Sequence, residues 1–294
     1  MLWLSDKRNM SDYRIRLEGF FLLVLFSLSV FVWGFDVTSS FPIATGVWYT
    51  HIQTDTTGVL RNYNILKIDY TLPEVEFTLA TATSGREETS SMAHRSNGLV
   101  AVNGGYFEWT GEHVGLLMHE GKVINGTYKM KPSRGAIGFG KNKKIVIDRV
   151  DYTDGKVTGL NGTDWSDITE IVSAGPILLR NGEIQPPWVD EELALSFSTS
   201  LHARTAIGIT KDTTVVLVVI DGYQPSISNG ISLGELSKYM QDLGCVNAMN
   251  LDGGGSSTMV IWDKVVNCVS DEVKPGLLGV ERPVTNALVV RRKN

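Results

Sequence analysis

The segment TVVLVVIDGYQPSISNGISLGELSKYMQDLGCVNAMNLDGGG, residues 214–255, decides how this 294-residue chain folds. Its first run, residues 214–220, is apolar enough to form a strand that is buried on both faces. Residues 232–244 place apolar side chains on one helical face, and residues 246–251 form a second apolar run. Strand, helix and strand in this order predict a crossover unit near the C-terminus.

Polar residues and a glycine mark the ends of this unit. Ser232 followed by Glu235 is a capping-box pair, and Gly244 suits the end of the helix. Asp221 follows the first strand directly, and Asp252 lies just beyond the second. If the two strands are parallel, both carboxylates emerge at the same edge of the sheet, whereas an antiparallel arrangement would separate them.

Short strand-like runs separated by turn signals occupy the rest of the chain after residue 40, without an internal repeat or a linker. Hairpin turns are predicted at Glu120–Gly121, Gly140–Lys143, Asn181–Gly182, Lys211–Asp212 and Asp263–Lys264. We therefore predict an α+β fold of mainly antiparallel or mixed β-sheets with a few helices, forming one domain over residues 36–294.

The N-terminus carries an apolar stretch, residues 19–35, without a charged residue in 17 positions. Basic residues precede it and the next one is Arg61, so the charge distribution predicts a cytoplasmic N-terminus and an exported remainder. The length is at the lower limit for a membrane-spanning helix, about 17–25 residues, and slightly above a signal-peptide core of about 7–15 residues. Residues 1–35 are either a cytoplasmic stub with a signal anchor, which we favour, or a signal peptide cleaved before Phe35. The remainder is then inner-membrane anchored or secreted, on the periplasmic or extracellular side.

Charge and cysteine content limit the expected partners. With 27 basic and 32 acidic residues, a formal net charge of −5 and no block of lysines or arginines, nucleic acid is not an expected partner. A small-molecule or glycan ligand fits this balance. Cys245 and Cys268 are too few for a disulfide framework and lack metal-site spacing. One disulfide and two buried free thiols are equally consistent with them.

The glycine run after Asp252 is the strongest candidate site. A plain turn needs one or two glycines, whereas three occur here, followed by two serines. Successive N–H groups in such a loop can form an anion-binding nest, and glycine lets a ligand approach the backbone closely. No lysine follows the glycines, so the loop is not a nucleotide P-loop. The candidate residues here are Asn250, Asp252, Gly253, Gly254, Ser256 and Ser257.

Three further motifs place polar residues at strand ends: AVNGGYF, residues 101–107, HARTAIG, residues 202–208, and ERPVTNA, residues 281–287. The last two each contain an arginine, the side chain suited to bidentate contact with phosphate. The candidate residues from these motifs are Asn103, Gly104, Gly105, Arg204, Thr205 and Arg282. The histidines show no metal-ligand spacing, and no Gly-x-Ser-x-Gly elbow occurs. We predict no required cofactor or metal, although Asp and Asn oxygens leave a structural or catalytic Ca²⁺ or Mg²⁺ open.

Taken in order, these motifs resemble the phosphodiester glycosidase family. The resemblance covers most of residues 95–291 and runs through NGGYF, SAGPILLRNG, HARTAIG, VVIDGYQPSISNGISLGELSKYM, LGCVNAMNLDGGGSSTM and ERPVTNALVV. NLDGGGSSTM is its most diagnostic part, and the surrounding residues are similar to those of bacterial members. Two positions depart from the family pattern: Tyr106 stands where phenylalanine is frequent, and Tyr223 stands where arginine is common. The second departure removes one phosphate partner.

The resemblance implies hydrolysis of a sugar-1-phosphodiester at the glycosidic C–O bond, which releases an N-acetylglucosamine-like sugar and a phosphomonoester. A phosphate leaves more easily than an alkoxide, so such a site needs a phosphate cradle and a carboxylate for the oxocarbenium ion or the attacking water. Catalytic roles are expected for Asp252, Asp221 and Asn103, with Asp252 indispensable, and phosphate or substrate binding for the other candidates. Two rival functions stay open: a non-catalytic glycan-binding module on a membrane anchor, and a metal-dependent phosphodiesterase that cuts the P–O bond.

Overall fold

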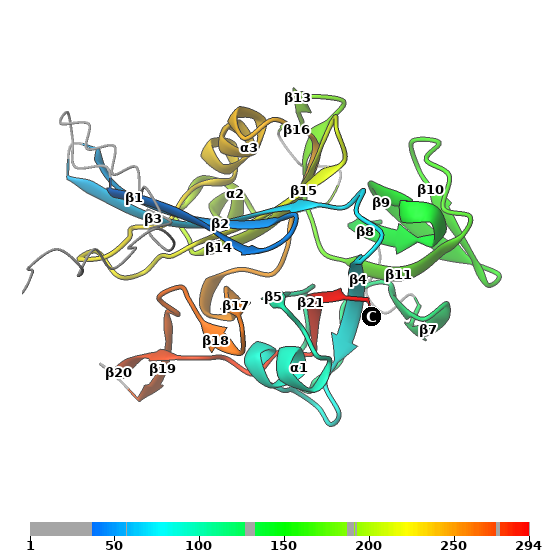
Figure 1. The fold of residues 1–294 in the computed structure, drawn as a ribbon, viewed down its shortest axis with the longest axis horizontal. Coiled ribbons are helices and arrows are strands. Elements are labelled where there is room, and N and C mark those ends of the chain that lie inside the picture. The colour runs from blue at the N-terminus through cyan, green and yellow to red at the C-terminus, as the bar shows by residue number, and fades with distance from the viewer. Residues whose placement is uncertain are drawn as a thin grey trace, which may run out of the picture.

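Three large β-sheets and a two-stranded ribbon make up most of this computed structural model, which describes residues 37–56, 58–126, 133–186, 191, 193–274 and 277–293 (Figure 1). In spatial order the eight-stranded sheet comprises β1 (Val37–Ala44), β2 (Val47–Thr56), β3 (Val59–Asp69), β15 (Thr214–Ile220), β14 (Arg204–Thr210), β16 (Cys245–Asn250), β12 (Ile177–Arg180) and β13 (Glu183–Ile184). The six-stranded sheet comprises β10 (Lys156–Gly159), β9 (Ile145–Thr153), β8 (Gly135–Gly140), β11 (Ile168–Ser173), β6 (Leu117–His119) and β7 (Lys122–Asn125).

The five-stranded sheet comprises β18 (Lys264–Val265), β17 (Met259–Ile261), β5 (Val100–Asn103), β21 (Asn286–Arg292) and β4 (Val75–Thr81). The ribbon pairs β19 (Asp271–Lys274) with β20 (Leu277–Val280). All pairs of named neighbouring strands in the described residues are antiparallel, which confirms the predicted mainly antiparallel architecture.

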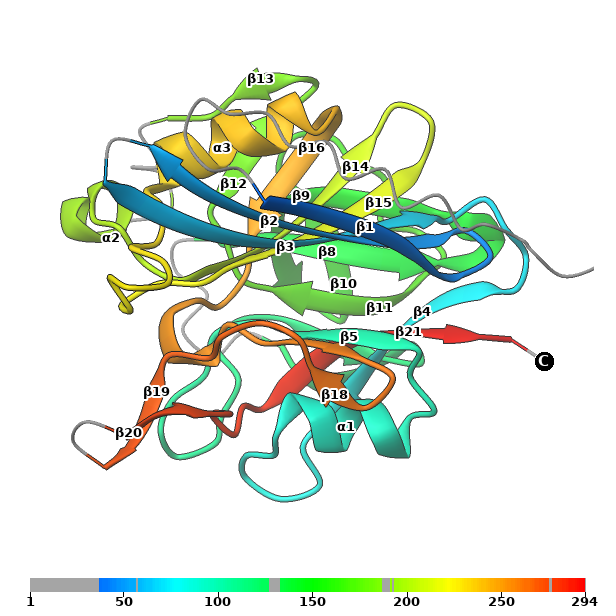
Figure 2. The same ribbon diagram turned by 60° about the vertical axis from the view of Figure 1, so that its left-hand side comes forward.

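The helices are few and short: α1 (Thr89–Arg95), α2 (Leu195–Thr199) and α3 (Leu233–Asp242). The capping box of α3 is present as predicted, because Ser232 Oγ accepts from the Glu235 N–H and the Glu235 carboxylate accepts from the Ser232 N–H. Leu236 and Met240 of α3 are fully buried in a core shared with strands of the eight-stranded sheet. Figure 2 shows α3 lying over that sheet. Amphipathic spacing therefore predicted α3 correctly, whereas α1 and α2 carried no strong sequence signal.

The predicted crossover runs from β15 through α3 to β16. Strand β14 lies between β15 and β16 and is antiparallel to both, so β15 and β16 run parallel to each other. Val218 of β15 and Asn250 of β16 both pair with Ala206 of β14, which places the two strands level. The two strands are therefore parallel, which was the condition for bringing the two carboxylates together. Asp221 and Asp252 leave the sheet at the same edge.

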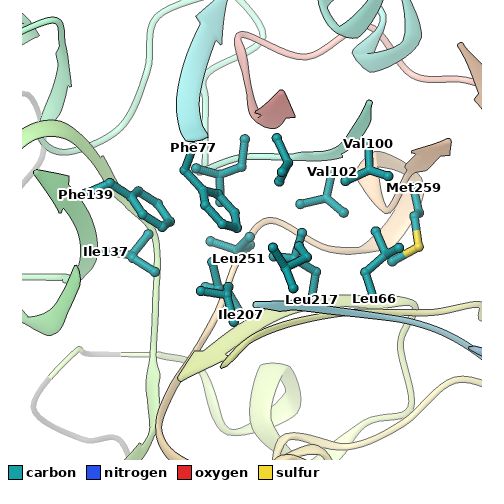
Figure 3. Close-up of a cluster of buried hydrophobic side chains, with 14 of the residues drawn as sticks. Leu66, Phe77, Val100, Val102, Ile137, Phe139, Ile207, Leu217, Leu251 and Met259 are labelled. Carbon is teal, nitrogen blue, oxygen red and sulfur yellow. The ribbon is translucent and has the colours of Figure 1, made fainter. Parts of the chain in front are cut away.

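A shared hydrophobic core holds the three sheets in their relative positions (Figure 3). Leu217 from the eight-stranded sheet and Val102 from the five-stranded sheet are fully buried in it. Phe77 and Phe139 stack at 4.4 Å between ring centres, and they join the five-stranded to the six-stranded sheet. Each such side chain contributes roughly 1.5–3 kcal/mol by burial, so the core fixes how the sheet edges meet.

Four of the predicted hairpins pair as expected: β6–β7, β8–β9, β12–β13 and β14–β15. The turn between β17 and β18 lies at Trp262–Asp263, one residue earlier than predicted, because both residues adopt positive φ. The predicted N-terminal helix, residues 19–35, lies outside the described residues. Within the described part of the chain, no helix has the length and apolar character needed to cross a bilayer.

Candidate active site

Strand ends from two sheets are joined at the candidate site by Asn103, the last residue of β5. Its Nδ2 donates to the backbone carbonyl of Asp252 (2.7 Å). Its Oδ1 accepts from Thr205 Oγ1 (2.8 Å) and from the Thr258 N–H (3.1 Å). Asn103 and Thr205 are fully buried. Both residues therefore act on the site by holding the Asp252 loop against β5 and β14.

The glycine loop after Asp252 is a packed turn. The Gly253 N–H donates to Asp252 Oδ1 (2.9 Å), and the Gly254 N–H donates to the Ala203 carbonyl (2.8 Å). The two serine N–H groups that follow donate back to loop carbonyls at 3.2 and 3.1 Å. Gly254 has a φ of 60°, and a Cβ on Gly253 would lie 2.8 Å from the Ala203 carbonyl oxygen. These four N–H groups already have acceptors in the protein, which argues against the predicted anion-binding nest.

The glycines after Asn103 also serve close packing. The N–H groups of Gly104 and Gly105 donate to the backbone carbonyl and to Oδ1 of Asn286, at 3.0 Å each. A Cβ on Gly104 would lie 1.9 Å from Asn286 Oδ1, and one on Gly105 would lie 2.1 Å from the Ser173 carbonyl oxygen. The expected phosphate contact of these two N–H groups is therefore not available.

Asp252 is the carboxylate that this packing presents. It is only partly exposed, and it accepts hydrogen bonds from the Gly253 N–H and from the Ser256 side chain. Burial raises the pKa of Asp252 to about 6, while these hydrogen bonds and the charge of Arg282 oppose the rise. A carboxylate that titrates near neutral pH suits a base or a nucleophile.

Asp221 lies at the same sheet edge but is enclosed by protein donors. It is 1% exposed. Its carboxylate accepts from Asn62 Nδ2 (2.5 Å), from Asn267 Nδ2 (3.0 Å) and from the Cys268 N–H (3.1 Å to each oxygen). Burial raises the pKa of Asp221, and these three donors oppose it. This enclosure argues against the expected catalytic pairing with Asp252, because the Asp221 carboxylate ties β3 and the segment after β18 to the end of β15.

We expect Asp221→Asn to lower the free energy of unfolding by about 2–3 kcal/mol. The NH₂ group of the new amide would face one of the N–H donors that now bond the carboxylate, and that hydrogen bond would be lost. Urea unfolding should show a lower midpoint with an unchanged slope. Activity per folded molecule should stay near wild type. The matched control is Asp263→Asn on the exposed β17–β18 turn. Lost activity with an unchanged midpoint would return Asp221 to the chemistry.

Arg204 is a buried cation at the start of β14. It is 1% exposed, and its guanidinium carbon lies 4.7 Å from the centre of the Phe197 ring. Nε donates to the Ile231 carbonyl (3.3 Å) and Nη2 donates to the Phe197 carbonyl (2.5 Å). Burial lowers the pKa of Arg204 to about 10, and no carboxylate among the described residues offsets this. A buried guanidinium without a counter-charge is unfavourable, so it predicts an anionic ligand.

Arg282 is the second cation of the site, and its guanidinium packs against Gly255, the third glycine of the loop. Its Nε and Nη2 pair with the two oxygens of Asp271 (2.8 Å each), and Nη1 lies 3.5 Å from Ser256 Oγ. Its guanidinium carbon also lies 5.3 Å from the centre of the Trp109 ring. A Cβ on Gly255 would lie 2.3 Å from Arg282 Nη2. The run of three glycines therefore exists partly to let Arg282 lie against the backbone.

We expect Gly255→Ala to push Arg282 away from the loop and to lower kcat/KM by tenfold or more, about 1.4 kcal/mol of transition-state stabilisation. The clash falls on the end of a flexible side chain, so the melting temperature should change little. The control is Gly234→Ala in α3, where an added Cβ meets nothing within 4 Å. Unchanged kcat/KM in Gly255→Ala would show that the position of Arg282 is unimportant.

Aromatic side chains complete the surroundings of Arg204. The Phe197 ring lies 6.4 Å from Tyr106 and 6.4 Å from His202, and the His202 ring lies 5.6 Å from Tyr223. His202 Nδ1 and the Tyr223 hydroxyl are hydrogen-bonded. Of these four, only His202 was retained from the sequence, because it lies two residues from Arg204. Tyr106 and Tyr223 lie inside motifs quoted above, which is the signal that could have found them, whereas Phe197 belongs to a segment without a motif.

The remaining candidates lie beneath the site. Asn250 Nδ2 donates to the Tyr106 hydroxyl and to the Gly175 carbonyl (3.0 Å each). Asn250 Oδ1 and Ser257 Oγ are buried and make no hydrogen bond with a described residue. Cys245 and Cys268 are both free thiols, and only Cys245 is buried, so the second alternative holds in part. Within the described residues no cluster of three or more His, Cys, Asp or Glu side chains could hold a metal ion.

Several known proteins are similar to this chain. The SPbeta prophage-derived uncharacterized protein YomE of Bacillus subtilis is 29% identical over 216 residues, which cover 71% of this chain and 30% of that protein. The N-acetylglucosamine-1-phosphodiester alpha-N-acetylglucosaminidase of Mus musculus is 26% identical over 210 residues, 65% of this chain and 37% of that enzyme. The chain thus spans roughly a third of the length of these curated relatives.

A solved structure shares the fold, and a family model covers most of the chain. The zebrafish N-acetylglucosamine-1-phosphodiester alpha-N-acetylglucosaminidase catalytic domain, auto-inhibited by its pro-peptide, matches with a TM-score of 0.66 at 24% identity, over 87% of this chain and 84% of that one. The family model described as phosphodiester glycosidase matches residues 96–291. The chain therefore belongs to the phosphodiester glycosidase family.

Proposed function

We propose that this chain hydrolyses a sugar-1-phosphodiester at the glycosidic C–O bond and releases a free sugar and a phosphomonoester. The observation that carries the proposal is Arg204, a buried guanidinium that has no carboxylate partner in the described part of the chain. Arg204 lies against Phe197, whose ring contacts Tyr106, while Arg282 and Asp252 both interact with Ser256. An anion held by two arginines beside a carboxylate is the arrangement that such a substrate needs.

Charge development during the reaction explains why two arginines are useful. The diester carries one negative charge, and breaking the C1–O bond adds a second charge to the departing phosphate. Arg204 and Arg282, with Ser256 Oγ beside Arg282, would hold that phosphate in a partly desolvated site, where such contacts stabilise more than they do in water. Asp252 would stabilise the positive charge at C1 or activate a water, and Asn103 would hold it in place through the backbone.

N-acetylglucosamine is the first sugar to test, because the mouse and zebrafish relatives are named for N-acetylglucosamine-1-phosphodiesters. The purified full chain, in detergent, would be incubated with an alkyl N-acetylglucosamine-1-phosphodiester in ¹⁸O-labelled water. We expect the label in the released sugar. Label in the phosphate would mean P–O cleavage, and no turnover across a panel of sugars would favour a glycan-binding module.

We propose that the reaction needs no cofactor or metal. One oxygen of Asp252 accepts the Gly253 N–H, and both oxygens of Asp271 accept from Arg282. These two carboxylates therefore offer a cation few unpaired oxygen ligands. Turnover should therefore persist after treatment with a chelator. Loss of turnover that Ca²⁺ or Mg²⁺ restores would instead support a metal-dependent phosphodiesterase or a structural cation.

We also propose that the catalytic domain works outside the cytoplasm, anchored by residues 19–35 or secreted. The support is the uncharged stretch itself and the basic residues that precede it. Membrane fractionation of cells expressing the full chain should find the protein in the membrane fraction after alkaline washing. Its recovery in the culture medium with Phe35 at the N-terminus would instead indicate a cleaved signal peptide.

A further inference from the structure

The enclosure of Asp221 leaves Asp252 without the second acid–base group that the sequence predicted. Tyr106 does not replace it, because its hydroxyl donates to the Gly175 carbonyl (2.5 Å) and accepts from Asn250 Nδ2 (3.0 Å). The remaining titratable side chains around Arg204 are the hydrogen-bonded pair of His202 and Tyr223.

Tyr223 lies beside the proposed phosphate site. Its hydroxyl is 3.7 Å from the position of a Cβ on Gly254, so the phenol lies over the glycine loop. The phenol is hydrogen-bonded to His202, whose ring stacks on Phe197, and Phe197 in turn lies against the Arg204 guanidinium. An anion held between Arg204 and the glycine loop would therefore come close to the Tyr223 hydroxyl.

The backbone of Tyr223 indicates that this placement is enforced. Tyr223 has a φ of 60°, a conformation that bulky residues rarely adopt and that tends to persist at functional sites. Its side chain nevertheless remains 48% exposed. The preceding Gly222 allows the turn, because a Cβ there would lie 2.4 Å from the Ala203 nitrogen. The aromatic ring is thus held at the site although neither burial nor local geometry favours it.

His202 is held rigidly behind the phenol. Its backbone exchanges hydrogen bonds with Ile231, and a Cβ on Gly230 would lie 2.5 Å from the His202 carbonyl oxygen. Its ring stacks on Phe197. Burial and the charge of Arg204 lower the pKa of His202, and a hydrogen bond to the Ser196 backbone opposes this. A neutral imidazole has one N–H; with that N–H directed to Ser196, Nδ1 accepts the phenolic proton.

We propose that Tyr223 and His202 form a proton-donating pair on the phosphate side of the reaction, with Tyr223 contacting the leaving phosphate and His202 supplying its proton. This inference rests on the proposed function. The negative diester would offset the field of Arg204, and His202 would then take up a proton on Nδ1. The phenol would turn its O–H from His202 toward the phosphate.

The bond-breaking step balances with this arrangement. The C1–O bond breaks and its electron pair moves to the phosphate oxygen, which takes the phenolic proton while the His202 Nδ1 proton moves to the phenol oxygen. Water adds its oxygen to C1 and gives its proton to Asp252. Solvent then removes the proton from Asp252 and returns one to His202. Tyr223, the member of the pair that contacts the phosphate, is thus a titratable donor at the position where arginine is common in the family pattern.

The pair is tested with Tyr223→Phe, which keeps the ring, and with His202→Gln, which keeps an acceptor but cannot be protonated. In the full chain each variant should lower kcat about 100-fold, the low end of general acid catalysis, with the ¹⁸O label still in the sugar. The control is Tyr152→Phe in β9, which should match wild type.

Proton uptake separates a relay from a merely structural hydrogen bond. A non-cleavable C-glycosyl phosphonate diester of N-acetylglucosamine would be titrated calorimetrically in two buffers of different ionisation enthalpy. Wild type should take up a proton on binding, and His202→Gln should not. The charged groups that bear on this uptake are Arg204, Arg282 and, through Arg282, Asp252 and Asp271.

The outcomes distinguish the two proposals. If wild type releases labelled sugar but Tyr223→Phe stays within twofold of its kcat, or His202→Gln still takes up a proton, the pair is wrong and the glycosidase proposal survives. If wild type places the label in phosphate or turns over no sugar-1-phosphodiester, the proposed function fails, and the pair fails with it.

Discussion

Asp252→Asn is expected to lower kcat by about 10³-fold or more, the scale seen when a principal catalytic group is removed from an enzyme site. The amide keeps the size and the hydrogen bond from Gly253, but it can neither attack C1, accept a proton from water nor offset a positive charge. Binding of the non-cleavable phosphonate diester should survive, because Arg204 and Arg282 remain in place.

The pH profile of the wild type provides a second measure of Asp252. Because the ionised form does the work and its pKa is raised to about 6, kcat/KM should fall as the pH drops through that value. The exposed Asp263→Asn serves as the matched control and should keep both the rate and the acid limb. An Asp252→Asn enzyme with near-normal kcat would move the reaction to another carboxylate.

Arg204→Lys should have the next largest effect, a loss in kcat/KM of about 10²–10³-fold, which corresponds to roughly 3–4 kcal/mol. Lysine keeps the charge but lacks the planar fork, so it cannot bond the Ile231 and Phe197 carbonyls, stack on Phe197 and still face a phosphate. Wild type should also gain thermal stability from millimolar phosphomonoester, by mass action, and the variant should gain less.

The control for this variant is Arg291→Lys, a half-exposed residue of β21 that pairs with Glu76. It should change neither kcat/KM nor the stabilisation by phosphomonoester. If Arg204→Lys behaved in the same way, Arg204 would be a structural cation, and the phosphate would have to bind at Arg282 alone.

Much of the architecture was predictable because local signals act over a few residues. The capping box of Ser232 and Glu235 and the Asn181–Gly182 turn are short-range patterns, and each forms as predicted. The pairing of β14 with β15 follows from a short turn between two apolar runs. The order of strands within the sheets was not predictable, since β3 pairs with β15 across a separation of about 150 residues, and no local preference specifies that partner.

The candidate site was only partly predictable, because a suitable residue type does not guarantee that the residue is free to contact a ligand. Asp252, Arg204 and Arg282 were identified from their chemistry. In the structure Asp252 and Arg282 both interact with Ser256, and Arg204 lies against Phe197, beside Tyr106. Asp221 and the N–H groups of Gly104 and Gly253 had equally suitable chemistry, but protein groups already engage them. Sequence patterns cannot report this, since hydrogen-bond partners come from distant segments.

The strand–helix–strand unit, the family resemblance and the acid followed by three glycines could be identified without coordinates, because each is a pattern of neighbouring residues. The function of the glycines depends on contacts with distant segments and became clear only from the fold. Gly253 clears the Ala203 carbonyl, and Gly255 clears the Arg282 guanidinium. Tertiary packing also encloses Asp221, leaves Asp252 partly exposed and brings His202 to Tyr223. Those outcomes depend on how sheets pack across their shared core, where contacts join residues far apart in the chain.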